Sequence, residues 1–360
     1  MRATGRRTPA GTAPHPADAG SRRTPGGDLV NRPVLEANNL LKRFPVFNGL
    51  TRRRVGHVTA VDGVSLRVEP GETLGLVGES GCGKSTVARL LTRLVDPTSG
   101  TVHLNGTEVT GLGQEALRPL RRDLQMVFQD PFSSLNPRQT VRQILAAPYR
   151  YQGLEPAEPV EELLERVGLR PEHAARHPHE FSGGQAQRIG IARALALRPR
   201  LVVCDEPVSA LDVSVQAQVL NLLKDLQQQY GLAYVFIAHD LGVVRQISSR
   251  IAVMYLGTVV ERADRDTLFS RAAHPYTHAL LSAVPLPDPD AERSRERIRL
   301  DGDLPSPLNP PGGCPFRTRC PKAAERCAAE RPDLRAIAEG HEVACHYPEP
   351  LSAERTAPTP

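Results

Sequence analysis

Short apolar runs alternate with segments of helical periodicity and with glycine-bearing turns from Val34 to about residue 270. β-branched or leucine-rich runs of this kind are typical of strands, and their alternation with helical segments predicts an α/β sheet. The predicted strands are Thr73–Val77, Leu124–Phe128, Leu201–Cys204, Tyr234–Ala238 and Ile251–Tyr255.

Two further segments show helical spacing. The first predicts an amphipathic helix with one face on the sheet, and its apolar positions are Leu211, Val215, Val219, Leu222, Leu223 and Leu226. Between Gln129 and Ser182 the strand signals fade, and a short amphipathic helix is marked by Val160, Leu163, Leu164 and Val167. This second region predicts a helical insertion into the α/β core.

The two ends of the chain differ from this pattern. Residues 1–33 are rich in Pro, Gly, Arg, Thr and Ala without periodicity, which predicts a disordered basic tail. A solvated tail is favoured over one that binds anionic lipid or nucleic acid. After about Phe269 the sequence becomes Pro-rich, then Arg-rich, then rich in cysteine. With 360 residues, the chain is expected to form one domain of about 230 to 250 residues with appendages.

Composition is that of an ordinary soluble enzyme, with 40% hydrophobic and 24% charged residues and a net charge of +5. No stretch reaches the roughly 18 apolar residues that a spanning helix needs. The pair Arg6-Arg7 is followed by no apolar core, so it does not indicate an export signal. We therefore expect a cytoplasmic protein that binds no nucleic acid.

The strongest local motif is Gly78-Glu79-Ser80-Gly81-Cys82-Gly83-Lys84-Ser85-Thr86, which follows a predicted strand and opens a helix near Lys84. Glycines in this context let successive N–H groups form an anion nest at a helix N-terminus. Lys84 is expected to reach the β- and γ-phosphates of a nucleotide, and the Ser85 hydroxyl to bind Mg²⁺. Cys82 fills a variable position and is assigned no redox role.

Two acids follow the strand Leu201–Cys204. A buried strand places Asp205 at the carboxyl edge of the sheet beside the phosphate loop, where it can hold Mg²⁺ through water. Glu206 is then placed to act on the attacking water as the catalytic base.

A second helix-terminus anion site, Ser182-Gly183-Gly184-Gln185, lies before the helical segment around Ile189. With this motif the chain resembles the ABC ATPase family, in which the signature of one subunit closes over ATP on the phosphate loop of its partner. Phe181 stands where Leu is commoner. The resemblance implies a P-loop NTPase (RecA-like) core with an antiparallel β subdomain and a helical insertion, over residues 34–272 with the helical subdomain at about 130–185.

The resemblance assigns further residues. Gln129 matches the Q-loop that senses Mg²⁺ and contacts the permease, and His239 matches the switch histidine at the γ-phosphate. Phe44 is the aromatic expected to stack on adenine, with Phe47 as the alternative. The D-loop corresponds to Ser209-Ala210-Leu211-Asp212.

Segments 130–138 and 274–277, with Leu280 and Leu281, resemble the oligopeptide and dipeptide importer branch, and the whole chain is similar to its F-type subunit. This implies ATP hydrolysis coupled to peptide import at the cytoplasmic face of the membrane. The implied partners are a second ABC ATPase subunit, two permease subunits and an extracytoplasmic solute-binding protein. A nickel importer ATPase, a soluble non-transport ABC ATPase and an exporter ATPase are the alternatives.

Four cysteines, Cys314, Cys320, Cys327 and Cys345, fall within the C-terminal extension, residues 273–360. In a reducing compartment such a group argues for a metal rather than for disulfides. Similar tails in peptide-importer ATPases imply a [4Fe–4S] cluster, which we favour over Zn²⁺ and over free thiols.

Overall fold

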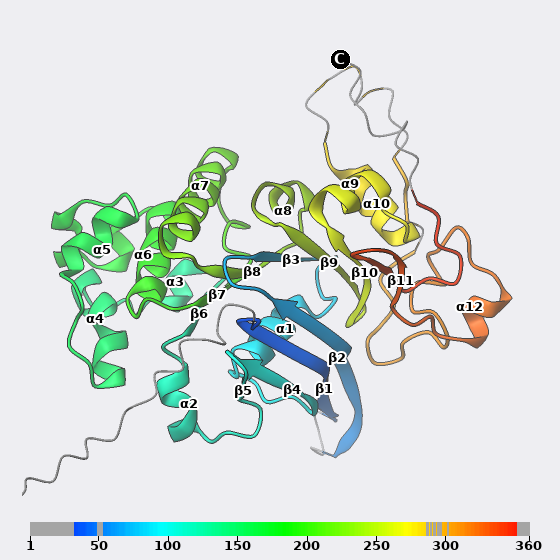
Figure 1. Ribbon diagram of the computed structural model, residues 1–360, viewed down its shortest axis with the longest axis horizontal. Coiled ribbons are helices and arrows are strands. Elements are labelled where there is room, and N and C mark those ends of the chain that lie inside the picture. Colours follow the sequence, from blue (N-terminus) through cyan, green and yellow to red (C-terminus); the bar gives the residue numbers. More distant parts are fainter. Residues whose placement is uncertain are drawn as a thin grey trace, which may run out of the picture. The chain divides into compact units, whose positions relative to one another are not determined.

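The computed structural model describes residues 32–48, 53–285, 288, 290, 293, 297–300 and 302–350. The basic tail predicted for residues 1–33 lies outside the described residues, apart from Arg32 and Pro33. The described chain forms two sheets with helices packed around them (Figure 1).

The larger sheet has eight strands in the order β11-β12-β10-β9-β3-β8-β7-β6. The strands from β9 to β6 are parallel, whereas β10, β12 and β11 are antiparallel to their neighbours. Their bounds are β3 (Thr73–Val77), β6 (Leu124–Val127), β7 (Leu201–Asp205), β8 (Ala233–Ala238), β9 (Arg250–Tyr255), β10 (Thr258–Asp264), β11 (Arg335–Ala338) and β12 (His341–Val343). Every predicted strand is present, with each end within about one residue of its prediction.

Both faces of the parallel strands are buried. On β3, Leu74 and Leu76 join one hydrophobic cluster and Val77 joins the other. On β8, Val235 and Phe236 divide in the same way. Successive side chains of a strand point to opposite faces, so continuous apolar runs of this kind specify a sheet covered on both sides.

The smaller sheet is antiparallel, with the order β2-β1-β4-β5, and confirms the predicted β subdomain. Its strands are β1 (Leu35–Phe47), β2 (Arg54–Val68), β4 (Ser99–Leu104) and β5 (Thr107–Glu108). Leu35 and Val64 belong to the same cluster as Leu74 and Leu76, so this sheet packs on one face of the central sheet together with the helix that follows β3.

Helices cover the remaining surfaces. Their bounds are α1 (Lys84–Leu91), α2 (Gln114–Leu120), α3 (Pro131–Ser134), α4 (Val141–Gln152), α5 (Val160–Arg166), α6 (Gly183–Leu195), α7 (Val213–Tyr230), α8 (Leu241–Ile247), α9 (Arg265–Arg271), α10 (Pro275–Ala283) and α12 (Glu325–Ala329), with 3₁₀ turns at Pro171–Ala175 and Pro178–Glu180. The predicted helical insertion is present as α3, α4 and α5, which gather against α6 (Figure 1). Among the described residues, no helix combines the length and apolarity needed to cross a membrane.

The amphipathic helix predicted from Leu211 begins two residues later. Asp212 accepts a hydrogen bond from the N–H of Val215 at 3.0 Å and so caps α7, which leaves Leu211 in the preceding turn. Leu220 is fully buried, whereas Leu222 is only partly buried, because the inner face of α7 follows Val219, Leu220, Leu223 and Leu226.

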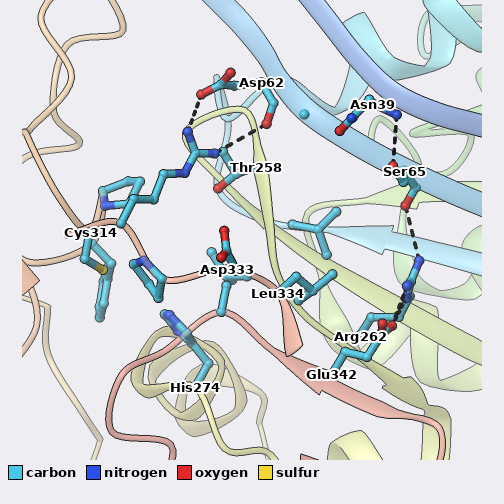
Figure 2. Close-up of a pocket in the computed structure, with 18 residues that line it drawn as sticks. Asn39, Asp62, Ser65, Thr258, Arg262, His274, Cys314, Asp333, Leu334 and Glu342 are labelled. Carbon is cyan, nitrogen blue, oxygen red and sulfur yellow. Dashed lines mark hydrogen bonds and ion pairs between the residues drawn. The ribbon is translucent and has the colours of Figure 1, made fainter. Parts of the chain in front are cut away.

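The C-terminal extension is joined to the core by a strand pairing that the sequence pattern did not predict. Strand β12 pairs with β10, so the β11–β12 hairpin lengthens the central sheet. Within this pairing, Arg262 Nε donates to Glu342 Oε2 at 2.6 Å. A cavity of about 530 Å³ lies at the junction (Figure 2). Among its lining residues, Arg331 forms an ion pair with Asp62.

A buried carboxylate fastens this junction. Glu261 on β10 is 0% exposed, and Oε1 accepts hydrogen bonds from the N–H of Ala273 and from His341 Nε2, each at 2.7 Å. Its Oε2 accepts the N–H of His274 at 3.1 Å. Three donors thus converge on one carboxylate, and all three belong to residues 273–360.

We expect Glu261→Gln to lower the free energy of unfolding by about 2 kcal/mol, because the amide presents an NH₂ group to a donor that the carboxylate satisfied. Urea unfolding of the full chain measures this. The matched control is Glu330→Gln, whose side chain forms an exposed pair with Arg326 at 3.1 Å and should change stability by less than about 0.5 kcal/mol. Equal midpoints for Glu261→Gln and the unchanged chain would show that the buried pair does not stabilise the fold.

Candidate active site

The phosphate loop connects β3 to α1 in a conformation that only glycine adopts readily. Gly83, the N-cap of α1, has a φ of 106°, and a Cβ there would lie 2.2 Å from the carbonyl oxygen of Ala60. Lys84 is 4% exposed, and its Nζ donates to the carbonyls of Gly78 at 2.7 Å and Glu79 at 3.1 Å. The loop carbonyls therefore hold the lysine ammonium beside the N-terminus of α1, where a helix favours an anion.

The two predicted acids lie where β7 meets this loop. Asp205 Oδ1 accepts a hydrogen bond from Ser85 Oγ at 2.9 Å. Burial raises the pKa of the Asp205 carboxyl, and the Ser85 hydrogen bond opposes that rise. Hydroxyl and carboxylate oxygens side by side are ligands that Mg²⁺ prefers.

Glu206 stands at the centre of the polar cluster. Its Oε2 accepts a hydrogen bond from Gln129 Nε2 at 3.0 Å and lies 3.5 Å from His239 Nδ1, while its Oε1 lies 3.8 Å from Lys84 Nζ. Its φ of 47° is uncommon for a residue other than glycine. The structure thus brings together Lys84, Gln129, Glu206 and His239 from four different segments.

Gln129, Glu206 and His239 open onto a cavity of about 470 Å³. His239 is half exposed there, and the D-loop contributes Ser209 and Ala210. The full lining is Ser80, Gln129, Asp130, Glu206, Ser209, Ala210 and His239.

The signature residues lie elsewhere. Ser182 caps α6 by accepting the N–H of Gln185, and the Gln185 side chain accepts the N–H of Ser182 at 3.0 Å. A Cβ on Gly184 would lie 2.5 Å from Cγ1 of Val215, so the signature packs against the start of α7. Within the described part of the chain, no hydrogen bond or ion pair joins it to the phosphate loop. This separation fits a motif that acts on a partner's nucleotide.

The predicted adenine-stacking aromatic lies on the smaller sheet. Phe44 on β1 is 39% exposed, and Lys42 Nζ lies 5.0 Å from its ring centroid. Phe47, the alternative, is 55% exposed. Both rings are accessible to a ligand, and neither is part of the hydrophobic core.

The cysteines of the extension do not form a metal site in the described residues, where no group of three or more His, Cys, Asp or Glu side chains is placed to hold a metal ion. Burial raises the pKa of the Cys314 thiol to about 11, and the neighbouring Cys327, Cys345 and Cys320 contribute to the rise. The predicted [4Fe–4S] cluster and its Zn²⁺ alternative therefore find no support in the structure. Burial likewise raises the pKa of Cys82.

Two contacts to the phosphate loop were missed by the motif analysis. The Tyr276 hydroxyl accepts the N–H of Glu79 at 2.9 Å, and Arg319 forms an ion pair with the Glu79 carboxylate. These partners lie 197 and 240 residues away from Glu79 in the sequence, so no local signal links them to it.

Known proteins similar to this chain share both its core and its extension. The sequence profile described as ABC transporter matches residues 61–209, and that described as oligopeptide/dipeptide transporter, C-terminal region, matches residues 260–327. The oligopeptide transport ATP-binding protein AppF of Bacillus subtilis is 54% identical over 318 residues, 87% of this chain and 97% of that protein. OppF of Escherichia coli, with the same description, is 55% identical over 297 residues, 81% of this chain and 89% of that protein.

Similarity extends to solved structures. A dimeric ATP-binding cassette in a post-hydrolysis state, bound to ADP and phosphate, has a TM-score of 0.57 and 29% identity. The match covers 64% of this chain and 98% of that chain.

Proposed function

Because this chain belongs to the ABC transporter family, we propose that it is the ATP-hydrolysing subunit of an importer of dipeptides or oligopeptides. The observation that carries peptide import is the match of residues 260–327 to the oligopeptide/dipeptide transporter C-terminal region, together with relatives that are more than half identical and are described as oligopeptide transport ATP-binding proteins. A nickel importer or a non-transport ATPase has no such observation in its favour.

The site residues divide the work of ATP hydrolysis. Lys84 leaves the carbonyls of Gly78 and Glu79 to bind the β- and γ-phosphates, and the loop N–H groups surround them. Glu206 accepts a proton from the attacking water, which Gln129 and His239 help to place because both side chains converge on the same carboxylate oxygen.

The side-chain oxygens at the site have the chemistry that a Mg²⁺ ion requires of its ligands. Ser85 and Asp205 offer a hydroxyl and a carboxylate oxygen that already lie 2.9 Å apart, and Gln129 contacts the adjacent Glu206 through Nε2. This hard-oxygen set fits Mg²⁺, which when bound neutralises charge on the β- and γ-phosphates. The cysteines of the extension have no part in this proposal.

A complete site requires a second subunit. The signature Ser182–Gln185 stands apart from the chain's own phosphate loop, so in our proposal it closes over ATP held by a partner ATPase subunit, and the D-loop lies at that interface. Residues 34–272 form the nucleotide-binding part, with the helical subdomain at about 130–185, and residues 273–360 form the extension.

The remaining partners follow from the importer assignment. We infer two permease subunits in the membrane and an extracytoplasmic solute-binding protein, with this chain at the cytoplasmic face. In this arrangement the helices α3 and α4, which follow Gln129, face the permease. Closure of the ATPase pair then drives the permease toward its outward-facing state, and hydrolysis resets it.

Uptake by cells that lack the chromosomal copy of this chain tests the proposal. We expect radiolabelled di- and tripeptide uptake to return when the chain is supplied, and to stay absent when the Lys84→Ala variant is supplied at equal abundance. Uptake of ⁶³Ni²⁺ is measured in the same cells. Restoration of nickel uptake without peptide uptake would overturn the peptide assignment in favour of the metal.

A further inference from the structure

One carboxylate belongs to the phosphate loop itself. Glu79 is the second residue of the loop, and its carbonyl accepts a hydrogen bond from Lys84 Nζ at 3.1 Å. A triphosphate carries several negative charges, so an uncompensated carboxylate beside the nest weakens its binding. Lys84 does not offset that charge, because its contacts with Glu79 are to the main chain and its ammonium is needed for the phosphates.

The compensating cation comes from the C-terminal extension. Arg319 contacts both carboxylate oxygens of Glu79, with Nη1 2.7 Å from Oε2 and Nη2 3.1 Å from Oε1. The Arg319 side chain is 9% exposed and that of Glu79 is 29% exposed, so solvent screens this pair less than a surface pair. A bidentate pair of this kind fixes direction as well as charge.

Aromatic residues hold Arg319 in place. The main-chain N–H of Arg319 donates to the carbonyl of Phe316 at 3.0 Å. The buried Phe316 ring has its centroid 5.2 Å from that of the Tyr255 ring and 5.4 Å from that of the Tyr276 ring. Tyr276, at the start of α10, is itself fully buried and accepts the Glu79 N–H at 2.9 Å. The main chain and the side chain of Glu79 are therefore both fixed by residues that lie after residue 270.

We propose that Arg319 is a positioning residue for ATP, which neutralises Glu79 and so makes tight ATP binding depend on a docked C-terminal extension. The proposal rests on the nucleotide site proposed above. It gives the extension a role in the ATPase cycle, since any partner that displaces the 314–320 segment also returns a negative charge to the phosphate loop.

A purely structural role for Arg319 predicts a different result for ATP binding by the variants. If Arg319 only fastens the extension to the core, removing either partner breaks the same bond, and the double variant is no better than the single ones. Neutralisation of Glu79 by Arg319 predicts instead that the double variant binds ATP more tightly than Arg319→Gln does. Once Arg319 is gone, removing the Glu79 charge should restore ATP binding.

The test uses the full-length chain with Mg²⁺ and a fluorescent ATP analogue, and compares Arg319→Gln, Glu79→Gln and the double variant. We expect Arg319→Gln to raise the dissociation constant about tenfold, which corresponds to one pair interaction in a partly screened site. The double variant should return to within about twofold of the unchanged chain. The turnover number at saturating ATP should change less than about twofold in Arg319→Gln, since the residue touches no reacting group.

Arg317→Gln is the matched control, because Arg317 lies two residues away on the same segment and donates to the Gly312 carbonyl at 2.8 Å within the extension. It should bind ATP like the unchanged chain. Arg319→Lys keeps the charge and should lose less than about threefold, and it serves as the second variant if Arg319→Gln folds poorly.

A dissociation constant of Arg319→Gln equal to that of the unchanged chain, or a double variant as weak as Arg319→Gln, overturns the proposal. Failure of the unchanged chain to bind the analogue would instead overturn the nucleotide site, so the two failures are separable.

Discussion

Replacing Glu206 by Gln should reduce ATP turnover on the order of 10³-fold at saturating ATP, within the range that a positioned general base contributes. The amide has the shape of the carboxylate, so Gln129 and His239 keep a neighbour of the same size, but it cannot take the proton of the attacking water. ATP binding should stay within about threefold of the unchanged chain, because Lys84 and the loop N–H groups are untouched. Release of inorganic phosphate by the purified protein measures the turnover, and ATP binding is measured in parallel on the same protein.

The same variant should trap a dimer in the presence of ATP, since the step that reopens the closed interface is blocked. Size-exclusion chromatography with and without Mg²⁺-ATP measures this. Asp130→Asn is the control, because Asp130 is a second acid lining the same cavity and caps α3 by accepting the N–H of Phe132 at 3.0 Å, a role that Asn can take over. Its turnover should stay within about threefold. Normal phosphate release by Glu206→Gln would show that the base is another group.

The parallel strands were predictable because each is a short apolar run with both faces buried. Such runs can be recognised in the sequence without knowing which helices or strands pack against them. The antiparallel edge was not predictable in this way. The residues of β11, from Arg335 to Ala338, are mostly exposed, so hydrophobic pattern alone gives them no strand signal, and β12 is held by its pairing with β10 and by the buried contact of His341 with Glu261.

Site residues that belong to motifs were predictable for a related reason. Lys84 opens a helix, and Asp205 and His239 end or follow strands, so the edge of a parallel sheet brings them together whatever the loops do. The role of Arg319 was not predictable, because its partner Glu79 is 240 residues away in the sequence. Nothing in the local sequence distinguishes Arg319 from the other arginines of the same stretch. For the cysteine tail the sequence misled, since four cysteines in an expected reducing compartment and the resemblance of the tail suggested a metal centre that the described geometry does not form.

Replacing Gly83 by Ala should raise the dissociation constant for ATP more than about 100-fold, a loss near 2.7 kcal/mol. The glycine has a φ of 106°, which L-residues rarely adopt, and the new Cβ would lie 2.2 Å from the carbonyl oxygen of Ala60. That neighbour is main chain, so neither group can move without a shift of the loop or of β2. Because Gly83 caps α1 directly before Lys84, the shift misplaces the helix N-terminus and the lysine together.

Gly231→Ala separates the clash with the Ala60 carbonyl from the general cost of placing alanine at a positive φ. Gly231 ends α7 with a φ of 64°, and a Cβ there would meet nothing within 4 Å. It should cost about 1 kcal/mol of stability and leave ATP affinity unchanged. Titration of the full chain with a fluorescent ATP analogue compares the two variants. If they bind ATP equally well, then the contact between Gly83 and the Ala60 carbonyl does not set the shape of the phosphate loop, and the nest tolerates a side chain that its backbone geometry excludes.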